Sequence, residues 1–351
     1  MAAPTAFGGG EIYRRRFFVA LVLPSLVAGE IACRPWFQRS TLPANLSDQD
    51  FWSLTTTLSE PAGTFTHSEN LVSNEAHFAH TIRRLARRGG VYIGVGPEQN
   101  FSFITRLRPD MAFIIDIRRE NRNLHLMYKA LFEISSDRAE FVSRLFSRER
   151  PPGLGPATTV QDLFAAYGPV SPAAGLYHQS LRLIRERLVD THNFPLSSSD
   201  MEWMTHALEA FYTDGPEIHY GRSLPRDAAG PSYRALMVAT DLSRESRSYL
   251  ATEEGFAFVK DLHARNLIVP VVGDFAGPDA IRRTGEYVRQ HHASVEAFYG
   301  SNVEVYLNRR MVSLYCANLA TLPSRSMTPF INSKGMQTFA AKLRSCSPPP
   351  R

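Results

Sequence analysis

Two glycines and an aspartate have the types and the spacing of a nucleotide-binding turn. Gly94 ends a short apolar run at residues 91–94, Gly96 follows it, and Asp116 closes the next apolar run at residues 111–117. Glycines let the backbone turn tightly and let a ligand approach, and the helix that follows would direct free N–H groups at that ligand. A carboxylate about 20 residues further on commonly binds ribose hydroxyls. These three residues are the predicted cofactor-binding residues; the alternative is a buried strand pair with no ligand.

The residues after the turn indicate which ligand to expect. The third glycine of a G-x-G-x-x-G pattern would fall at Gln99, and that of the tighter G-x-G-x-G pattern at Glu98. A carboxylate beside a pyrophosphate would repel it. We therefore expect a cofactor without phosphates, such as S-adenosylmethionine, in preference to NAD.

Further polar residues stand at the ends of the later predicted strands, where ligands bind in open α/β sheets. They are Asp241 after residues 233–240, Asp274 after residues 267–272, and Ser301 and Asn302 after residues 294–299. Asp274 lies between a glycine and an aromatic residue and is a predicted catalytic or substrate-binding residue. The other three are predicted to bind substrate, although Asp241 and Asn302 could equally cap the helices that follow.

A loop rich in polar residues, residues 59–75, precedes the first core strand. It could fold over the strand ends as a lid, with Glu60, Asn70, Asn74 and Glu75 supplying hydrogen bonds to the ligand. Glu75 is a second predicted catalytic residue, which would orient or deprotonate an acceptor. We expect Ser73 to cap the helix predicted from Glu75 to Arg88. For Asn70 and Glu75, local capping is an equal alternative to ligand contact.

Strand and helix patterns alternate over most of the chain. The apolar runs predict an α/β fold with a doubly wound, mostly parallel sheet of the Rossmann type, interrupted by a helical insertion between strands 2 and 3. The predicted divisions are a targeting segment at 1–38, N-terminal helices and the lid loop at 39–89, the first half of the core at 90–136, the helical insertion at 137–230, the second half of the core at 231–335 and a C-terminal tail at 336–351.

The charge distribution and the histidines indicate whether nucleic acid or a metal ion is an expected partner. The net charge is +5, but the arginines are spread through the chain and no basic tract with interleaved aromatic residues occurs, so we expect no nucleic acid partner. His77 and His80 could share a helix face, yet no third ligand accompanies them, so no metal site is predicted. The expected partner is a small molecule, and the sequence does not indicate an oligomeric state.

The three cysteines, Cys33, Cys316 and Cys346, have a spacing that fits neither a zinc site nor a disulfide framework. Cys316 lies in a mixed apolar stretch. We therefore expect it to be a small buried residue and not a nucleophile.

Residues 1–38 have the pattern of an export signal. Three arginines at residues 14–16 precede an aromatic pair and an apolar run at residues 19–28 that ends in small residues. The arginines before an aromatic residue resemble a twin-arginine signal, which exports folded proteins, so the expected location is exported or periplasmic. Membrane contact is expected through this segment alone. Pro24 interrupts the apolar run, so the alternative is a buried N-terminal helix in a cytoplasmic protein.

Several phrases of the chain resemble an uncharacterised bacterial family of often exported proteins. These phrases are GVGPEQNFSFI, AFIIDIRREN, LMYKALFEIS with DRAEFVSRLF, and NLIVPVVGDFAGP, and the resemblance covers roughly residues 46–330. It implies a Rossmann-type, methyltransferase-like core in which Gly94, Gly96 and Asp116 match the cofactor turn and the ribose acid. Tyr92, before the turn, and Glu98, after it, depart from that pattern.

Two functions remain open from the sequence. The first is an S-adenosylmethionine-dependent methyltransferase that acts on an unknown small acceptor. The second is an exported, non-catalytic binding or interaction protein on a degenerate Rossmann core. Fold class alone does not choose between them.

Overall fold

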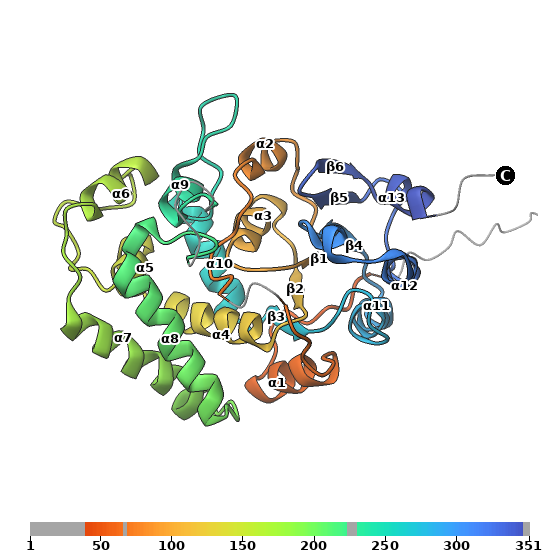
Figure 1. The fold of residues 1–351 in the computed structure, drawn as a ribbon, viewed down its shortest axis with the longest axis horizontal. Coiled ribbons are helices and arrows are strands. Elements are labelled where there is room, and N and C mark those ends of the chain that lie inside the picture. The colour runs from red at the N-terminus through yellow and green to blue at the C-terminus, as the bar shows by residue number, and fades with distance from the viewer. Residues whose placement is uncertain (1–38, 66–68, 223–229, 347–351) are drawn as a thin grey trace, which may run out of the picture. The chain divides into compact units, whose positions relative to one another are not determined.

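The computed structural model describes residues 39–65, 69–222 and 230–346 (Figure 1). The predicted targeting segment at residues 1–38 lies outside the described residues. Among the helices that are described, none is long and apolar enough to cross a membrane.

Helices and strands alternate in this order. The elements are α1 Asp48–Thr57, α2 Phe78–Arg83, β1 Val91–Gly94, α3 Gln99–Leu107, β2 Met111–Asp116, α4 Arg119–Ile134, α5 Arg138–Phe146, α6 Val160–Tyr167, α7 Ala174–Arg185, the π-helical turn η1 Glu186–Thr191, α8 Ser198–Asp214, the 3₁₀ turn η2 Gly215–Glu217, α9 Tyr233–Val238, α10 Glu253–Ala264, β3 Ile268–Val272, α11 Ala280–Gln290, β4 Val295–Tyr299, the 3₁₀ turn η3 Val303–Tyr306, α12 Arg309–Leu319, β5 Pro329–Asn332, β6 Gly335–Thr338 and α13 Phe339–Cys346.

The strands form one six-stranded sheet in the order β3-β2-β1-β4-β5-β6. All neighbouring strands run parallel except β6, which pairs antiparallel with β5 at one edge. Every residue of β1 to β4 is buried, as expected for parallel strands covered on both faces. The prediction of an α/β fold with a mostly parallel sheet is confirmed.

Helices cover both faces of the sheet. On one side α4 packs on β2 and β3, α3 packs on β1, and α10 packs against both helices. On the other side α1 contacts β3 and α11 contacts β2. The helices α5 to α9 form a further layer beyond α4 (Figure 1). The whole run from α4 to α10 lies between β2 and β3.

The prediction of a strand at residues 233–240 is wrong, because residues 233–238 form helix α9. The Ser232 side chain accepts a hydrogen bond from the Ala235 N–H and caps the helix. Tyr233, Leu236 and Met237 are buried, which is the spacing of one helix face. A short apolar run is consistent with either a buried strand or a buried helix, and here the N-cap decides in favour of the helix.

The C-terminal part also differs from expectation. Residues 336–346, which the sequence assigned to a tail, complete β6 and form α13. Cys316 and Cys346 form a disulfide with a Cα–Cα distance of 5.7 Å, so the expectation that no disulfide exists is wrong. The hairpin of β5 and β6 returns the chain so that α13 packs on α12. The two cysteines are 30 residues apart in the sequence, and this spacing alone does not indicate that they pair.

Removing the disulfide should destabilise the fold. We expect a Cys316→Ser, Cys346→Ser variant to lose about 3 kcal/mol in free energy of unfolding, because the unfolded chain is no longer constrained. Urea denaturation with and without reductant measures this loss. Reductant should lower the midpoint of the wild-type protein and leave that of the double variant unchanged; an unchanged wild-type midpoint would show that the bond is absent.

Candidate functional site

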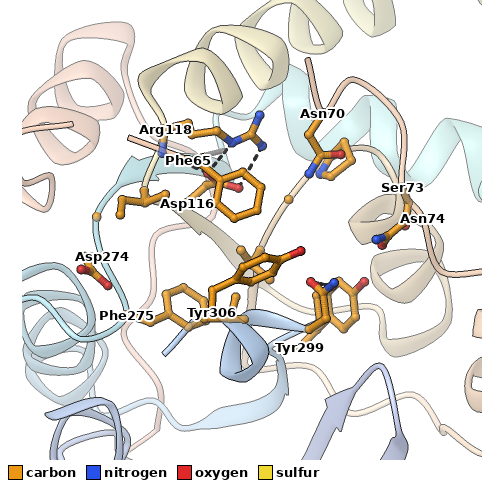
Figure 2. Close-up of a pocket in the computed structure, with 18 of the residues that line it drawn as sticks. Phe65, Asn70, Ser73, Asn74, Asp116, Arg118, Asp274, Phe275, Tyr299 and Tyr306 are labelled. Atoms are coloured by element: carbon orange, nitrogen blue, oxygen red, sulfur yellow. Dashed lines mark hydrogen bonds and ion pairs between the residues drawn. The ribbon is translucent and has the colours of Figure 1, made fainter. Parts of the chain in front are cut away.

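A cavity of about 190 Å³ opens at the carboxyl ends of β1 to β4, and we call it the strand-end cavity (Figure 2). The lid loop and the segment after β4 complete its walls. Of the residues predicted from the sequence, the structure brings seven to this lining: Asn70, Asn74, Gly96, Asp116, Asp274, Ser301 and Asn302. They come from five different parts of the chain.

Three predicted site residues do not line this cavity. Gly94 packs against the helix below it, since a Cβ there would lie 1.9 Å from the Asn100 Oδ1 atom. Asp241 lies in a turn after α9, where its carboxylate pairs with Arg247 at 2.9 Å. Because the strand expected before Asp241 is a helix, that aspartate is not at the edge of the sheet. Glu75 lies behind the wall of the cavity.

The turn after β1 is open above and held from below. Gly96 has a φ angle of +78°, and a Cβ at this position would meet no atom within 4 Å. The Asn100 Nδ2 group donates to the carbonyls of Val95, Gly96 and Pro97 at 3.0, 3.1 and 2.7 Å. The His125 Nε2 atom lies 2.9 Å from the Gly96 oxygen. Burial lowers the pKa of His125 to about 4, so the neutral ring donates this hydrogen bond.

The sequence suggested that Glu98 places a negative charge beside the turn. The structure does not bear this out. Glu98 is fully buried beneath the cavity and is not part of its lining. Its Oε1 atom accepts a hydrogen bond from the Ser73 N–H at 3.3 Å. Burial raises the pKa of Glu98 to about 8, so the side chain is largely protonated at neutral pH. Repulsion by Glu98 therefore gives no reason to exclude a phosphate. Ser73 faces the turn and does not begin the next helix, so its predicted capping role is also wrong.

Asp116 lines the cavity already paired with a cation. The Arg118 Nε and Nη2 atoms lie 3.1 and 3.2 Å from its two carboxylate oxygens, and the Arg118 backbone N–H donates to it at 3.0 Å. Both side chains are buried. Figure 2 shows the pair beside the ring of Phe65, whose centroid lies 5.9 Å from the guanidinium carbon. Sequence reasoning missed Arg118, although an arginine two residues after the acid was visible.

Aromatic rings surround the mouth and floor of the cavity. Phe65 from the lid loop meets Tyr306 of η3 edge to face, with centroids 4.9 Å apart (Figure 2). Phe275 and Tyr299 lie deeper. These rings, which sequence reasoning also missed, offer faces to a planar or cationic group. Only the fold shows that residues 65, 275, 299 and 306 meet.

The position of Asp274 is set by its own loop and by the lid. Its Oδ1 atom accepts a hydrogen bond from the Ala276 N–H at 2.9 Å. Glu60 of the lid accepts from the N–H groups of Asp279 and Ala280 at 2.7 and 2.6 Å, at the start of α11. The lid is therefore anchored to the segment that carries Asp274, and Glu60 caps a helix.

Glu75 connects to the cavity through a hydrogen bond. The Ser301 hydroxyl donates to the Glu75 Oε1 atom, and Ser301 lines the strand-end cavity. Burial raises the pKa of Glu75, while hydrogen bonds from Ser301 and Tyr299 act in the opposite direction. The structure thus gives Glu75 a defined contact with the site, although not the direct position expected from the sequence.

A family model described as "Domain of unknown function (DUF7790)" matches residues 70–151 and 226–342. This is more than half of the chain, and the chain therefore belongs to that family. The matched parts contain the turn after β1, Asp116, Asp274 and the segment after β4, whereas the unmatched stretch between them contains α6, α7 and α8. A comparison with curated proteins gave no match.

Glu98 should make stability depend on pH. Its folded-state pKa of about 8 lies above its ordinary value, so the folded protein binds the proton more tightly than the unfolded chain. The protonated Glu98 side chain therefore contributes fully to the free energy of unfolding at low pH, and this contribution is lost as pH rises toward 8. Each unit of difference between the folded and unfolded pKa corresponds to about 1.4 kcal/mol. We expect the Glu98→Gln variant to lack this fall in stability between low and high pH. Denaturation curves of both proteins at pH 5 and pH 8.5 test it; an identical pH dependence would contradict the assignment.

Proposed function

We propose that this member of the DUF7790 family binds S-adenosylmethionine or a closely related nucleoside in the strand-end cavity and transfers its methyl group to a small acceptor. The observation that carries the proposal is that one cavity collects Gly96, Asp116 and Asp274 from the ends of β1, β2 and β3. Ligands of open α/β sheets bind at such strand ends, beside the point where the strand order reverses. Here that point lies between β1 and β4.

The topology supports a Rossmann-type, methyltransferase-like core. The strand order runs outward from β1 to β3 on one side and from β4 to β6 on the other, and the edge strand is antiparallel. The first helix after the turn, α3, begins at Gln99, shortly after β1 ends at Gly94. The fold supplies the place for the ligand, and the residues that line the cavity supply the chemistry.

The lining fits the parts of such a cofactor. An enclosed volume of about 150 Å³ is enough for benzene, so the observed 190 Å³ admits one ring, and the rest of a nucleoside would extend to the rim. The Asp116 Oδ2 atom accepts one hydrogen bond from Arg118, at 3.2 Å, which leaves lone-pair capacity for a ribose hydroxyl. The open face of Gly96 would allow close approach, and the rings of Phe275 and Tyr306 suit a sulfonium cation.

Two carboxylates can serve the acceptor. When bound, S-adenosylmethionine would supply an electrophilic methyl group, whose bond to sulfur breaks as the bond to the acceptor forms and leaves a neutral thioether. Asp274, in the lining, would orient the acceptor or the cofactor by accepting hydrogen bonds. Glu75 would receive the proton that the acceptor loses, either directly or through the Ser301 hydroxyl that it contacts. A carboxylate with a raised pKa is a stronger base than an ordinary one, which suits this role.

Binding of S-adenosylmethionine is the primary test. In calorimetry we expect the wild-type protein to bind it and Asp274→Asn to bind it roughly tenfold more weakly, a loss of about 1.4 kcal/mol for one charged contact. Asp274 is preferred to Asp116 for this test, because removing Asp116 would leave Arg118 buried without a partner.

Asp261→Asn, an exposed carboxylate on α10, is the matched control and should bind as the wild type does. The proposal fails if the wild-type protein releases no heat at millimolar S-adenosylmethionine. It is also contradicted if Asp261→Asn weakens binding as much as Asp274→Asn.

A second candidate is an exported, non-catalytic binding protein that uses the same cavity. The disulfide between Cys316 and Cys346 favours it, since such bonds persist in oxidising compartments, whereas S-adenosylmethionine is a cytoplasmic metabolite. The Arg118 pair on Asp116 also suits a binding protein whose ligand differs from a nucleoside. In this case the twin-arginine-like N-terminus would export the folded protein.

Cell fractionation separates the two candidates. For the exported protein we expect a chain shorter than the full sequence in the periplasmic fraction. Its Cys316 and Cys346 thiols should resist alkylation under denaturing conditions until reductant is added. A full-length chain confined to the cytoplasm, with both thiols reactive, would rule out the second candidate.

A further inference from the structure

A second cavity, of about 460 Å³, lies between α2 and the turn of the β5–β6 hairpin, and we call it the hairpin cavity. Figure 1 shows α2 beside this hairpin. Its lining comes from residues 74–78, 80 and 81 on one side and residues 331–335 on the other, with Phe103 and Asn302 between them. Asn74 and Asn302 belong to both cavities, so the two share a wall.

The rim of the hairpin cavity carries groups that suit an anion. His77, His80 and Lys334 all line it and are exposed. The two imidazole rings stack, with centroids 6.3 Å apart. Within the described residues, none of these three side chains forms a hydrogen bond or an ion pair. An incoming anion would therefore not have to displace a protein carboxylate from them.

The acidic residue in this lining, Glu75, already has a hydrogen-bond partner. Glu75 lines the hairpin cavity, and its carboxylate accepts the hydroxyl of Ser301, which lines the other cavity. This hydrogen bond crosses the shared wall. Among the described residues no group of three or more histidine, cysteine, aspartate and glutamate side chains is arranged to hold a metal ion, so the two histidines are not part of such a group.

The floor of the hairpin cavity is apolar. Phe78, Phe103 and Ile331 line it and are buried. A ligand that fills the cavity would thus place an apolar body on these side chains and a charged group at the rim. Burial of the apolar part contributes affinity, and the cationic rim selects the charge.

We propose that the hairpin cavity binds a small organic anion, with its carboxylate or phosphate at Lys334 and His80 and its apolar body on Phe78 and Phe103. Because the two cavities share Asn74 and Asn302, a molecule held here lies beside the ligand of the strand-end cavity. Its identification as the methyl acceptor rests on the proposed function. Binding of the anion itself does not.

The test uses three probes of similar size on the full chain: benzoate, phenyl phosphate and benzyl alcohol. In calorimetry or ligand-observed NMR we expect benzoate or phenyl phosphate to bind more tightly than neutral benzyl alcohol, and the tighter of the two identifies the charged group. In a Lys334→Gln, His80→Asn variant the affinity for the anion should fall at least roughly tenfold, because the Lys334 ammonium group and the His80 ring no longer contact the anion.

Arg83→Gln is the matched control. Arg83 is an exposed cation on the same helix, α2, but it does not line the cavity, and its replacement should leave anion binding unchanged. Circular dichroism checks that the exposed substitutions leave the fold intact. Binding of benzyl alcohol as tight as that of the tighter anion, no binding of either anion at millimolar concentration, or an unchanged affinity in the double variant would each overturn the proposal.

The test of anion binding does not depend on whether the protein binds S-adenosylmethionine. Asp274→Asn should weaken S-adenosylmethionine binding and leave benzoate binding unchanged, since Asp274 does not line the hairpin cavity. If the anion binds in a Lys334-dependent manner while S-adenosylmethionine does not bind, the hairpin cavity stands and the methyltransferase proposal fails.

Discussion

The site depends on how the turn after β1 is held from below. Asn100 is fully buried, and its amide nitrogen satisfies three consecutive carbonyls while its oxygen accepts the Tyr92 hydroxyl at 2.9 Å. Buried backbone oxygens without partners would be costly, so this side chain fixes the path of the turn. Through its hydrogen bond to Asn100, Tyr92 also supports the turn. With its carbonyls bound below, the turn leaves its upper face open to the cavity.

Two of the acidic side chains at the cavity, Asp116 and Glu98, are neutralised before any ligand arrives. Arg118 neutralises Asp116, and burial keeps Glu98 largely protonated at neutral pH. The remaining carboxylate in the lining is Asp274, whose loop is anchored by Glu60 of the lid. A cationic ligand would therefore be drawn toward the β3 side, while an anionic group would meet Arg118. The aromatic pair of Phe65 and Tyr306 adds an apolar rim that can shield either contact from water.

The C-terminal hairpin links the stability of the fold to the second cavity. The β5–β6 turn supplies Lys334 to the hairpin cavity, and the return of the chain through α13 is fixed to α12 by the disulfide. The same region carries η3 and Tyr306 at the mouth of the strand-end cavity. The disulfide thus closes the segment that contains the β5–β6 hairpin, which borders the hairpin cavity. The wall between them, with Asn74, Asn302 and the Glu75–Ser301 hydrogen bond, belongs to segments distant in sequence.

The sequence by itself determined the sheet and most of its strands, because buried parallel strands are continuous apolar runs and glycine turns mark their ends. It also indicated Gly96, Asp116 and Asp274, since polar residues after such strands converge at one edge. Local pattern did not separate strand from helix at residues 233–238, and so it misplaced Asp241. Only the tertiary structure decided that Arg118 pairs with Asp116, that Glu98 lies below the turn, and that Cys316 meets Cys346. These outcomes depend on burial and on contacts between distant segments, which no local spacing records.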